Sequence, residues 1–135
     1  MGAFQSHDLN HEHPTSDAFD LTLEVTVAKG AQPPRHESPN ASQFAIYANE
    51  TVAIDGMEWV PVRTGLSFAM PFMLILLVRG TGRDWEVQDQ VLDYDMTDEL
   101  VVHVRRPPAG GSAGKLTRIV AGSRVAMGVV LPIAR

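Results

Sequence analysis

The sequence predicts an all-β domain, either a β-sandwich or a jelly-roll barrel. Short apolar or alternating segments follow one another along the chain, and turn signals containing Gly, Pro or Asp separate them at close intervals. No segment has the apolar periodicity of an amphipathic helix, and no internal repeat is present. At 135 residues the chain is long enough for one domain with a substantial core.

The two ends of the chain differ in character. Residues 1–17 are polar, rich in histidine and aperiodic, so we expect an arm, followed by a single β domain over residues 18–135. Three histidines in the arm invite a metal interpretation: His7, His11 and His13. Because a metal site needs firmly positioned ligands, we expect a solvated or partner-bound tail there and no metal site.

The first strands are predicted from alternation. Residues 19–27 alternate apolar and polar side chains, which is typical of a half-buried strand. Residues 29–35 contain two prolines and predict a loop of extended character. Further short strands are predicted at 43–48 and 51–54, before the turn signal Asp55-Gly56.

The middle of the chain holds its most apolar segment. Strands are predicted at 59–64 and 66–70, and residues 72–78 are apolar at every position. A strand covered on both faces explains such a run, as does a subunit interface. The remaining strands are predicted at 85–87, 91–92, 100–104, 116–120 and 125–131, with a glycine-rich loop at 107–114.

A cluster of acidic residues lies between two of these strands. Residues 91–92 and 100–104 predict a β-hairpin, and its tip carries four acids: Asp93, Asp95, Asp98 and Glu99. A carboxylate in such a place can act as a general base, but acids are also common in solvated turns. His103 is expected to be an ordinary strand residue.

Composition excludes several classes of protein. The net charge of −5 argues against a nucleic-acid-binding surface, and the absence of cysteine excludes disulfides and thiol chemistry. Residues 68–78 are too few to span a bilayer and include Pro71, so no membrane partner is expected. The first residues lack the pattern of a signal peptide, so secretion by that route is not expected.

Six segments, in order and near-correct spacing, resemble the trimeric dUTP diphosphatase (dUTPase) family: 21–34, 42–48, 62–71, 79–82, 91–99 and 122–127. The resemblance extends over residues 21–132. It implies a jelly-roll β-barrel that assembles as a homotrimer, with active sites at the subunit boundaries.

The resemblance also implies roles for particular residues. Asp93 matches the aspartate that activates water for attack on the α-phosphorus, with Mg²⁺ clamping the triphosphate. The other substrate-binding positions, at the phosphate loop and the nucleoside loop, are Arg79, Gly80, Thr81, Val91, Leu92, Asp95 and Met96.

The chain departs from the family pattern at several of these motifs. Met96 replaces the tyrosine that packs on deoxyribose, and Asp98 replaces a glycine. Ala45 and Met127 replace an aspartate and a glutamine of the first and fourth motifs. The final residues 131–135 do not resemble the glycine-rich tail that closes over the triphosphate, so we expect that lid to be missing.

Two functions follow as hypotheses. The preferred one is a non-catalytic trimer that serves as a structural or assembly protein, such as a phage capsid decoration or cement protein, without a cofactor. It would reside in the virion and contact the shell through its N-terminal arm. The other is a divergent, cytoplasmic dUTP diphosphatase, in which Asp93 and Mg²⁺ support hydrolysis of dUTP to dUMP and pyrophosphate.

Overall fold

The computed structural model describes residues 2–6, 21–36, 43–80, 84–107 and 117–135. Within these ranges all regular secondary structure is β, which confirms the predicted fold class. The strands are β1 (Gly2–Ser6), β2 (Leu21–Val27), β3 (Arg35–His36), β4 (Gln43–Tyr47), β5 (Val52–Ile54), β6 (Val60–Arg63), β7 (Leu66–Ala69), β8 (Leu74–Arg79), β9 (Glu86–Val87), β10 (Gln90–Leu92), β11 (Val101–Arg105), β12 (Thr117–Ile119) and β13 (Arg124–Pro132).

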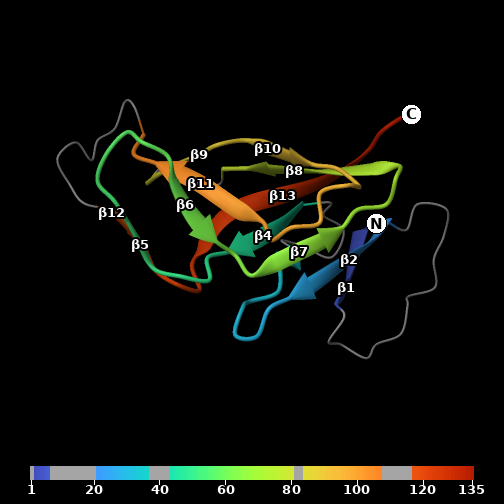
Figure 1. Ribbon diagram of the computed structural model, residues 1–135, viewed down its shortest axis with the longest axis horizontal. Coiled ribbons are helices and arrows are strands. Elements are labelled where there is room, and N and C mark those ends of the chain that lie inside the picture. Colours follow the sequence, from blue (N-terminus) through green and yellow to red (C-terminus); the bar gives the residue numbers. More distant parts are fainter. Residues whose placement is uncertain (1, 7–20, 37–42, 81–83, 108–116) are drawn as a thin grey trace.

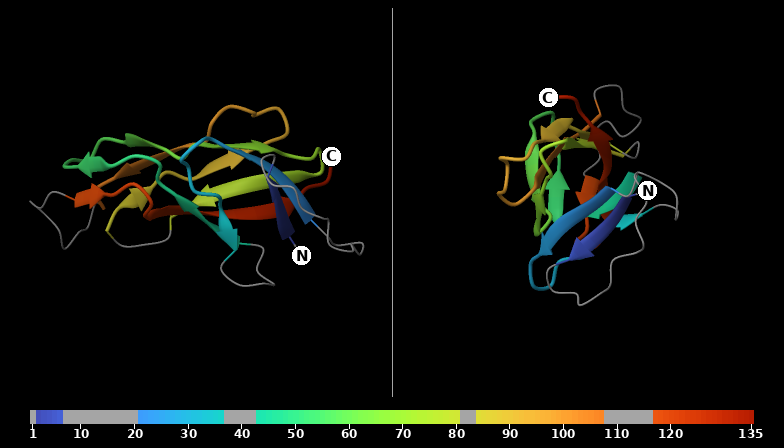
Figure 2. Two further views of the ribbon diagram at one scale, coloured as in Figure 1. Left: turned by 90° about the horizontal axis from the view of Figure 1, so that it is seen from below. Right: turned by 90° about the vertical axis from the view of Figure 1, so that its right-hand side faces the viewer.

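The strands form four sheets around one core, in an elongated jelly-roll barrel (Figures 1 and 2). The largest sheet has the order β10-β8-β13-β4-β3, and β6-β11-β9 forms a second sheet. The other two are β1-β2-β7 and β12-β5. No helix of the described residues is long and apolar enough to cross a membrane.

The long strand β13 organises the five-stranded sheet. It pairs antiparallel with β8 along the whole of that strand, from Met127 opposite Arg79 to Pro132 opposite Leu74. On its other side it pairs with β4, with a register shift just after Arg124. The two-residue strand β3 begins at the last residue of the predicted loop 29–35. There Arg35 pairs with Ala45 of β4.

The first strand falls within the predicted arm. β1 pairs in parallel with β2, from Gly2 opposite Leu21 to Ser6 opposite Val25. The β1-β2-β7 sheet therefore includes the first part of residues 1–17. Residues 7–17, with the three histidines of the arm, lie outside the described residues.

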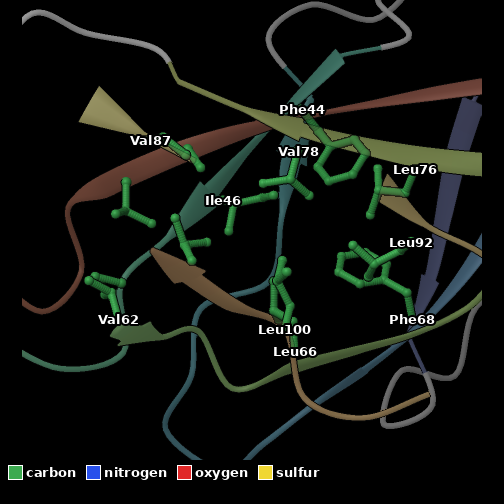
Figure 3. Packing of buried hydrophobic residues seen from close by; sticks show 14 of the residues in the cluster. Phe44, Ile46, Val62, Leu66, Phe68, Leu76, Val78, Val87, Leu92 and Leu100 are labelled. Carbon is green, nitrogen blue, oxygen red and sulfur yellow. The ribbon is translucent and has the colours of Figure 1, made fainter. Parts of the chain in front are cut away.

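The core fills the space between the large sheet and the strands facing it. In Figure 3, Phe44 and Val78 of the large sheet lie across from Leu66 and Leu100, and all four side chains are buried. Phe44 also packs against Gly128 of β13, where an added Cβ would lie 2.5 Å from the phenylalanine ring. Since real Cβ contacts are not this short, Gly128 makes room for the ring of Phe44.

The apolar segment 72–78 divides into a turn and a strand. Residues 72 and 73 form a turn, and β8 begins at Leu74. Leu76 and Val78 point into the core, whereas Ile75 and Leu77 are half-buried on the opposite side of the sheet. The alternation of a half-buried strand is present but invisible in the sequence, because both faces carry apolar side chains.

The neighbouring strands continue this second apolar surface. Val91 and Val129 lie on either side of Leu77, and Leu131 lies opposite Ile75. Directly opposed residues share a face of the sheet. We call the surface formed by Ile75, Leu77, Val91, Val129 and Leu131 the outer face.

Candidate functional site

The acidic segment connects two sheets and is not a β-hairpin. β10 pairs with β8, whereas β11 pairs with β6 and β9, so the hairpin prediction is wrong. The apolar residues at 91–92 and 100–104 indicated both strands but did not identify their partners. We call residues 93–100, between these strands, the acidic loop. The side-chain amide of Gln90 still bridges its two sides, donating to the carbonyl of Val101 at 2.9 Å.

The end of the acidic loop is held by the turn between β6 and β7. Arg63 donates from Nη2 to Oε1 of Glu99 at 2.9 Å, and the backbone N–H of Gly65 donates to Oε2 at 2.9 Å. Next to this pair, the buried hydroxyl of Thr64 donates to the carbonyl of Leu100 at 2.7 Å. The backbone N–H of Leu100 donates to the carbonyl of Leu66 at 2.7 Å. The loop therefore ends in a fixed position.

Charge and backbone conformation both suit this anchor. The hydrogen bond from Arg63 lowers the pKa of Glu99, and the backbone N–H of Gly65 lowers it further against the opposing effect of desolvation. Gly65 has φ +73°, and a Cβ there would lie 2.6 Å from the Cβ of Ala31. Only glycine can adopt this positive φ and also leave space for the side chain of Ala31 without strain.

The start of the acidic loop is held by a different arginine. Arg135 makes an ion pair with Oδ1 of Asp93, and the backbone N–H of Tyr94 donates to the same oxygen at 2.7 Å. The guanidinium also lies over two aromatic rings, with its Cζ 4.5 Å from the ring centre of Phe72 and 5.1 Å from that of Tyr94. Asp93 is therefore engaged by a cation of its own chain.

A hollow of about 260 Å³ lies beside the acidic loop. Its lining residues are Gln90, Leu92, Asp95, Met96, Thr97, Asp98, Glu99, Leu100 and Val101. Asp93 is not among them. A smaller hollow of about 140 Å³ lies against Glu99, Gly65, Thr26, Ala28 and Ser67. The larger hollow has space for part of a small ligand and presents mostly polar and acidic groups.

The structure brings together some of the predicted nucleotide-binding residues and separates others. Leu92, Asp95 and Met96 line the larger hollow, and the last two are exposed. Val91 points to the outer face and is 47% exposed. Predicted site residue Thr81 lies outside the described residues.

The predicted phosphate-binding and catalytic residues lie at opposite ends of β8. Gln90 pairs with Val78 and Leu92 with Leu76, so position 93 falls beside Ile75. Arg79 is four residues further along β8, which corresponds to about 13 Å at the rise of a β-strand. Arg79 and Gly80 are both exposed. Within one chain, Arg79 and Asp93 therefore do not form a common site.

The acids of the loop do not form a metal site of their own. Among the described residues, no three His, Cys, Asp or Glu side chains are placed to hold one ion. Mg²⁺ prefers several oxygen ligands in near-octahedral geometry and is usually held jointly with substrate phosphates. The part of a single chain that the structure describes therefore does not fit a resident Mg²⁺ ion.

Several residues of this site are not predicted by the sequence analysis. Arg135 and Phe72 belong to no motif, and Tyr94 lies within the segment 91–99 without an assigned role. The meeting of these three residues depends on the register of β13 on β8. Arg63 and Gly65 do lie within a segment that resembles a dUTPase motif, but pattern alone does not pair them with Glu99.

Comparison with known proteins supports the fold. No protein-family model matches the chain, and no curated protein matches it in sequence. Solved dUTPase structures do match. A mutant dUTPase of Staphylococcus phage 80alpha is 17% identical with a TM-score of 0.75, covering 84% of this chain and 85% of that chain.

Two further structures show the same likeness. A mutant dUTPase from phage phi11 of S. aureus, described with a structural Mg(II) ion, is 16% identical with a TM-score of 0.74, covering 84% of this chain and 92% of that chain. An 80alpha dUTPase mutant solved with dUpNHpp is 17% identical with a TM-score of 0.74 and 84% coverage of both chains. The chain therefore has the dUTPase fold, as its motifs predicted.

Proposed function

We propose that this chain is a non-catalytic homotrimer on the dUTPase fold, acting as a structural or assembly module such as a phage capsid decoration protein. The observation that carries the proposal is the engagement of Asp93 by Arg135. A general base must present a lone pair to the water that it activates. Here Oδ1 of Asp93 accepts from Arg135 and from the backbone N–H of Tyr94.

The residue at the nucleoside-contacting position supports the same conclusion. Met96, at a position where the family has a nucleoside-contacting tyrosine, is 50% exposed and offers a flexible wall. Arg79 and Asp93 lie about 13 Å apart along β8, so a site that used both would have to combine residues of two copies, as the family resemblance implies for sites at subunit boundaries. Hydrolysis would need groups supplied by another copy.

The outer face supports assembly of the chain with itself. Val91 and Leu131 are 47% and 39% exposed, and the half-buried Ile75, Leu77 and Val129 lie between and beside them. Contiguous exposed apolar surface of this kind marks association sites, and closed symmetry makes a trimer self-limiting. A rigid β-trimer would fit a three-fold position on a larger shell, with β1 as part of the body and residues 7–17 of the predicted arm as the proposed shell contact.

Phage dUTPases with this fold offer a precedent for a function other than hydrolysis. The 80alpha dUTPases are described as controlling the transfer of virulence genes by a mechanism like that of a proto-oncogenic G protein. A role in binding and assembly is in keeping with that use of the fold. In this proposal the chain acts in the virion and needs no cofactor.

Two measurements on the purified protein test the proposal. Light scattering should give three times the mass of one chain, and incubation with dUTP and Mg²⁺ should release no more pyrophosphate than a protein-free blank. A monomeric mass would rule out the proposed homotrimer. Pyrophosphate release that disappears in Asp93→Asn would overturn the non-catalytic assignment.

The hollow beside the acidic loop favours the second candidate, a divergent dUTP diphosphatase. Leu92 and Met96 line it on the loop that the family resemblance assigns to the nucleoside. In this mechanism Asp93 would take a proton from water as the oxygen attacks the α-phosphorus, and the bond to pyrophosphate would break to leave dUMP. Because Arg135 contacts Oδ1, the proton would pass to the other carboxylate oxygen unless Arg135 left Asp93. Activity lost in Asp93→Asn but kept in Asp89→Asn, an exposed control, would support this candidate.

A further inference from the structure

We propose that Phe72, Tyr94 and Asp93 form a guanidinium-binding cradle, and that Arg135 is its resident ligand and latches the start of the acidic loop. The proposal stands on these contacts and does not depend on the proposed function. In this proposal the aromatic and acidic groups at the edge of the outer face form a binding site for planar organic cations.

The two rings provide an aromatic corner for the cation. Phe72 and Tyr94 meet edge to face, with ring centres 4.9 Å apart and planes inclined at 67°. The Cζ atom of Arg135 lies 4.5 and 5.1 Å from their centres, within the range of cation–π attraction. One guanidinium therefore contacts both rings at once.

Two hydrogen bonds orient the guanidinium within this corner. Its Nε donates to the backbone carbonyl of Phe72, and its Nη2 donates to Oδ1 of Asp93. The donors of a guanidinium lie in a fixed plane and reach both acceptors together, whereas an ammonium is a compact point charge on a flexible stem. The cradle therefore selects for shape as well as charge.

The exposed fractions agree with a filled site. The side chain of Arg135 is 22% exposed and that of Asp93 is 29%, whereas the side chain of Arg63, which pairs with Glu99 at the other end of the loop, is 66% exposed. The side chain of Arg135 is therefore covered better than that of Arg63 in the other ion pair of the acidic loop. A surface arginine without a site would keep most of its guanidinium in water.

The sheet delivers Arg135 to this position. Pro132 is paired with Leu74, and the backbone N–H of Ile133 donates to the carbonyl of Met73 at 2.9 Å. The chain after β13 thus runs along the turn that precedes β8, as Figures 1 and 2 show for the red end of the ribbon. The latch connects this segment to Asp93, where the acidic loop begins.

Hydrogen exchange tests the latch without reference to any activity. Amide exchange over residues 93–98 should become several-fold faster in Arg135→Ala, and nearly as fast in Arg135→Lys. Arg118→Ala removes an exposed arginine of β12 and should leave exchange at the acidic loop unchanged. Addition of methylguanidinium should slow exchange again in Arg135→Ala, and ammonium at the same concentration should not.

A second variant tests the cradle itself. In an Arg135→Ala background, Tyr94→Leu should abolish the slowing by methylguanidinium, because one wall of the site is gone. Far-ultraviolet circular dichroism checks that each variant keeps its β structure. Unchanged exchange in Arg135→Ala would overturn the latch. Equal rescue by methylguanidinium and ammonium, or rescue that survives Tyr94→Leu, would overturn a guanidinium-selective cradle.

Discussion

Gly65 donates its backbone N–H to Oε2 of Glu99 across 34 positions of sequence, at 2.9 Å, while Arg63 donates to the other oxygen of the same carboxylate. One acid of the acidic loop therefore fixes the turn between β6 and β7 to the end of the loop. Of the four acids that first suggested a catalytic cluster, Glu99 has a structural role, and Asp93 is engaged by a second arginine.

The Glu99 anchor predicts a stability that depends on pH. Because the pKa of Glu99 is lowered in the folded state, its ionised form stabilises the fold above the ordinary value near 4.5, and this contribution is lost as the pH falls through the lowered pKa. Glu99→Gln should lower the midpoint of urea unfolding at neutral pH and reduce the loss between about pH 5 and pH 3. Glu58→Gln, at an exposed bend, should change neither. Equal acid sensitivity in wild type and Glu99→Gln would contradict the anchor.

Thr64 predicts a larger and pH-independent effect. Its fully buried hydroxyl donates to the carbonyl of Leu100 at 2.7 Å and accepts from the backbone N–H of Leu66 at 3.2 Å. Thr64→Val keeps the shape but leaves both backbone groups unsatisfied, so the free energy of unfolding should fall by about 1–3 kcal/mol. The exposed Thr26→Val on β2 is the matched control. Similar denaturant midpoints for the two variants would show that the hydroxyl is dispensable.

The sequence was informative about strands and weak about their partners. Alternation over residues 19–27 marked β2 and the short segment 43–48 marked β4, but nothing in the pattern of 91–92 and 100–104 showed that β10 and β11 join different sheets. The faces of β8 were hidden because every position is apolar. The family resemblance supplied the fold because it draws on the order of several motifs at once.

The residues of the candidate site were predicted less completely than the fold. The acids of the loop were evident, and Leu92, Asp95 and Met96 do line its hollow. The ion pair between Asp93 and Arg135 joins residues 42 positions apart and rests on the pairing of β13 with β8. Side-chain partners that depend on tertiary register leave no local signal in the sequence.

The contact between Gly128 and Phe44 predicts a steric effect. A Cβ at position 128 would lie 2.5 and 2.6 Å from two ring carbons of the fully buried Phe44. Gly128→Ala forces the ring or β13 to move and should lower the free energy of unfolding by about 1–3 kcal/mol. Gly56→Ala is the control, because nothing lies within 4 Å of its added Cβ. Chemical unfolding of the two variants compares them directly, and equal stability would mean that the core yields without strain.

The outer face predicts the behaviour of the assembly. Val91 and Leu131 are exposed in the single chain and lie on β10 and β13 on either side of β8, so a charge at either position should leave the fold intact. If this face joins the copies, Val91→Asp and Leu131→Asp bury an uncompensated carboxylate at the interface and should shift the light-scattering mass from three chains to one. Val120→Asp is the control. Val120 is 53% exposed and directly follows β12, which belongs to the separate β12-β5 sheet, so this variant should keep the trimer. A trimeric mass for all three variants would place the subunit contacts elsewhere, whereas a monomeric mass for Val120→Asp alone would assign them to the β12 end of the molecule.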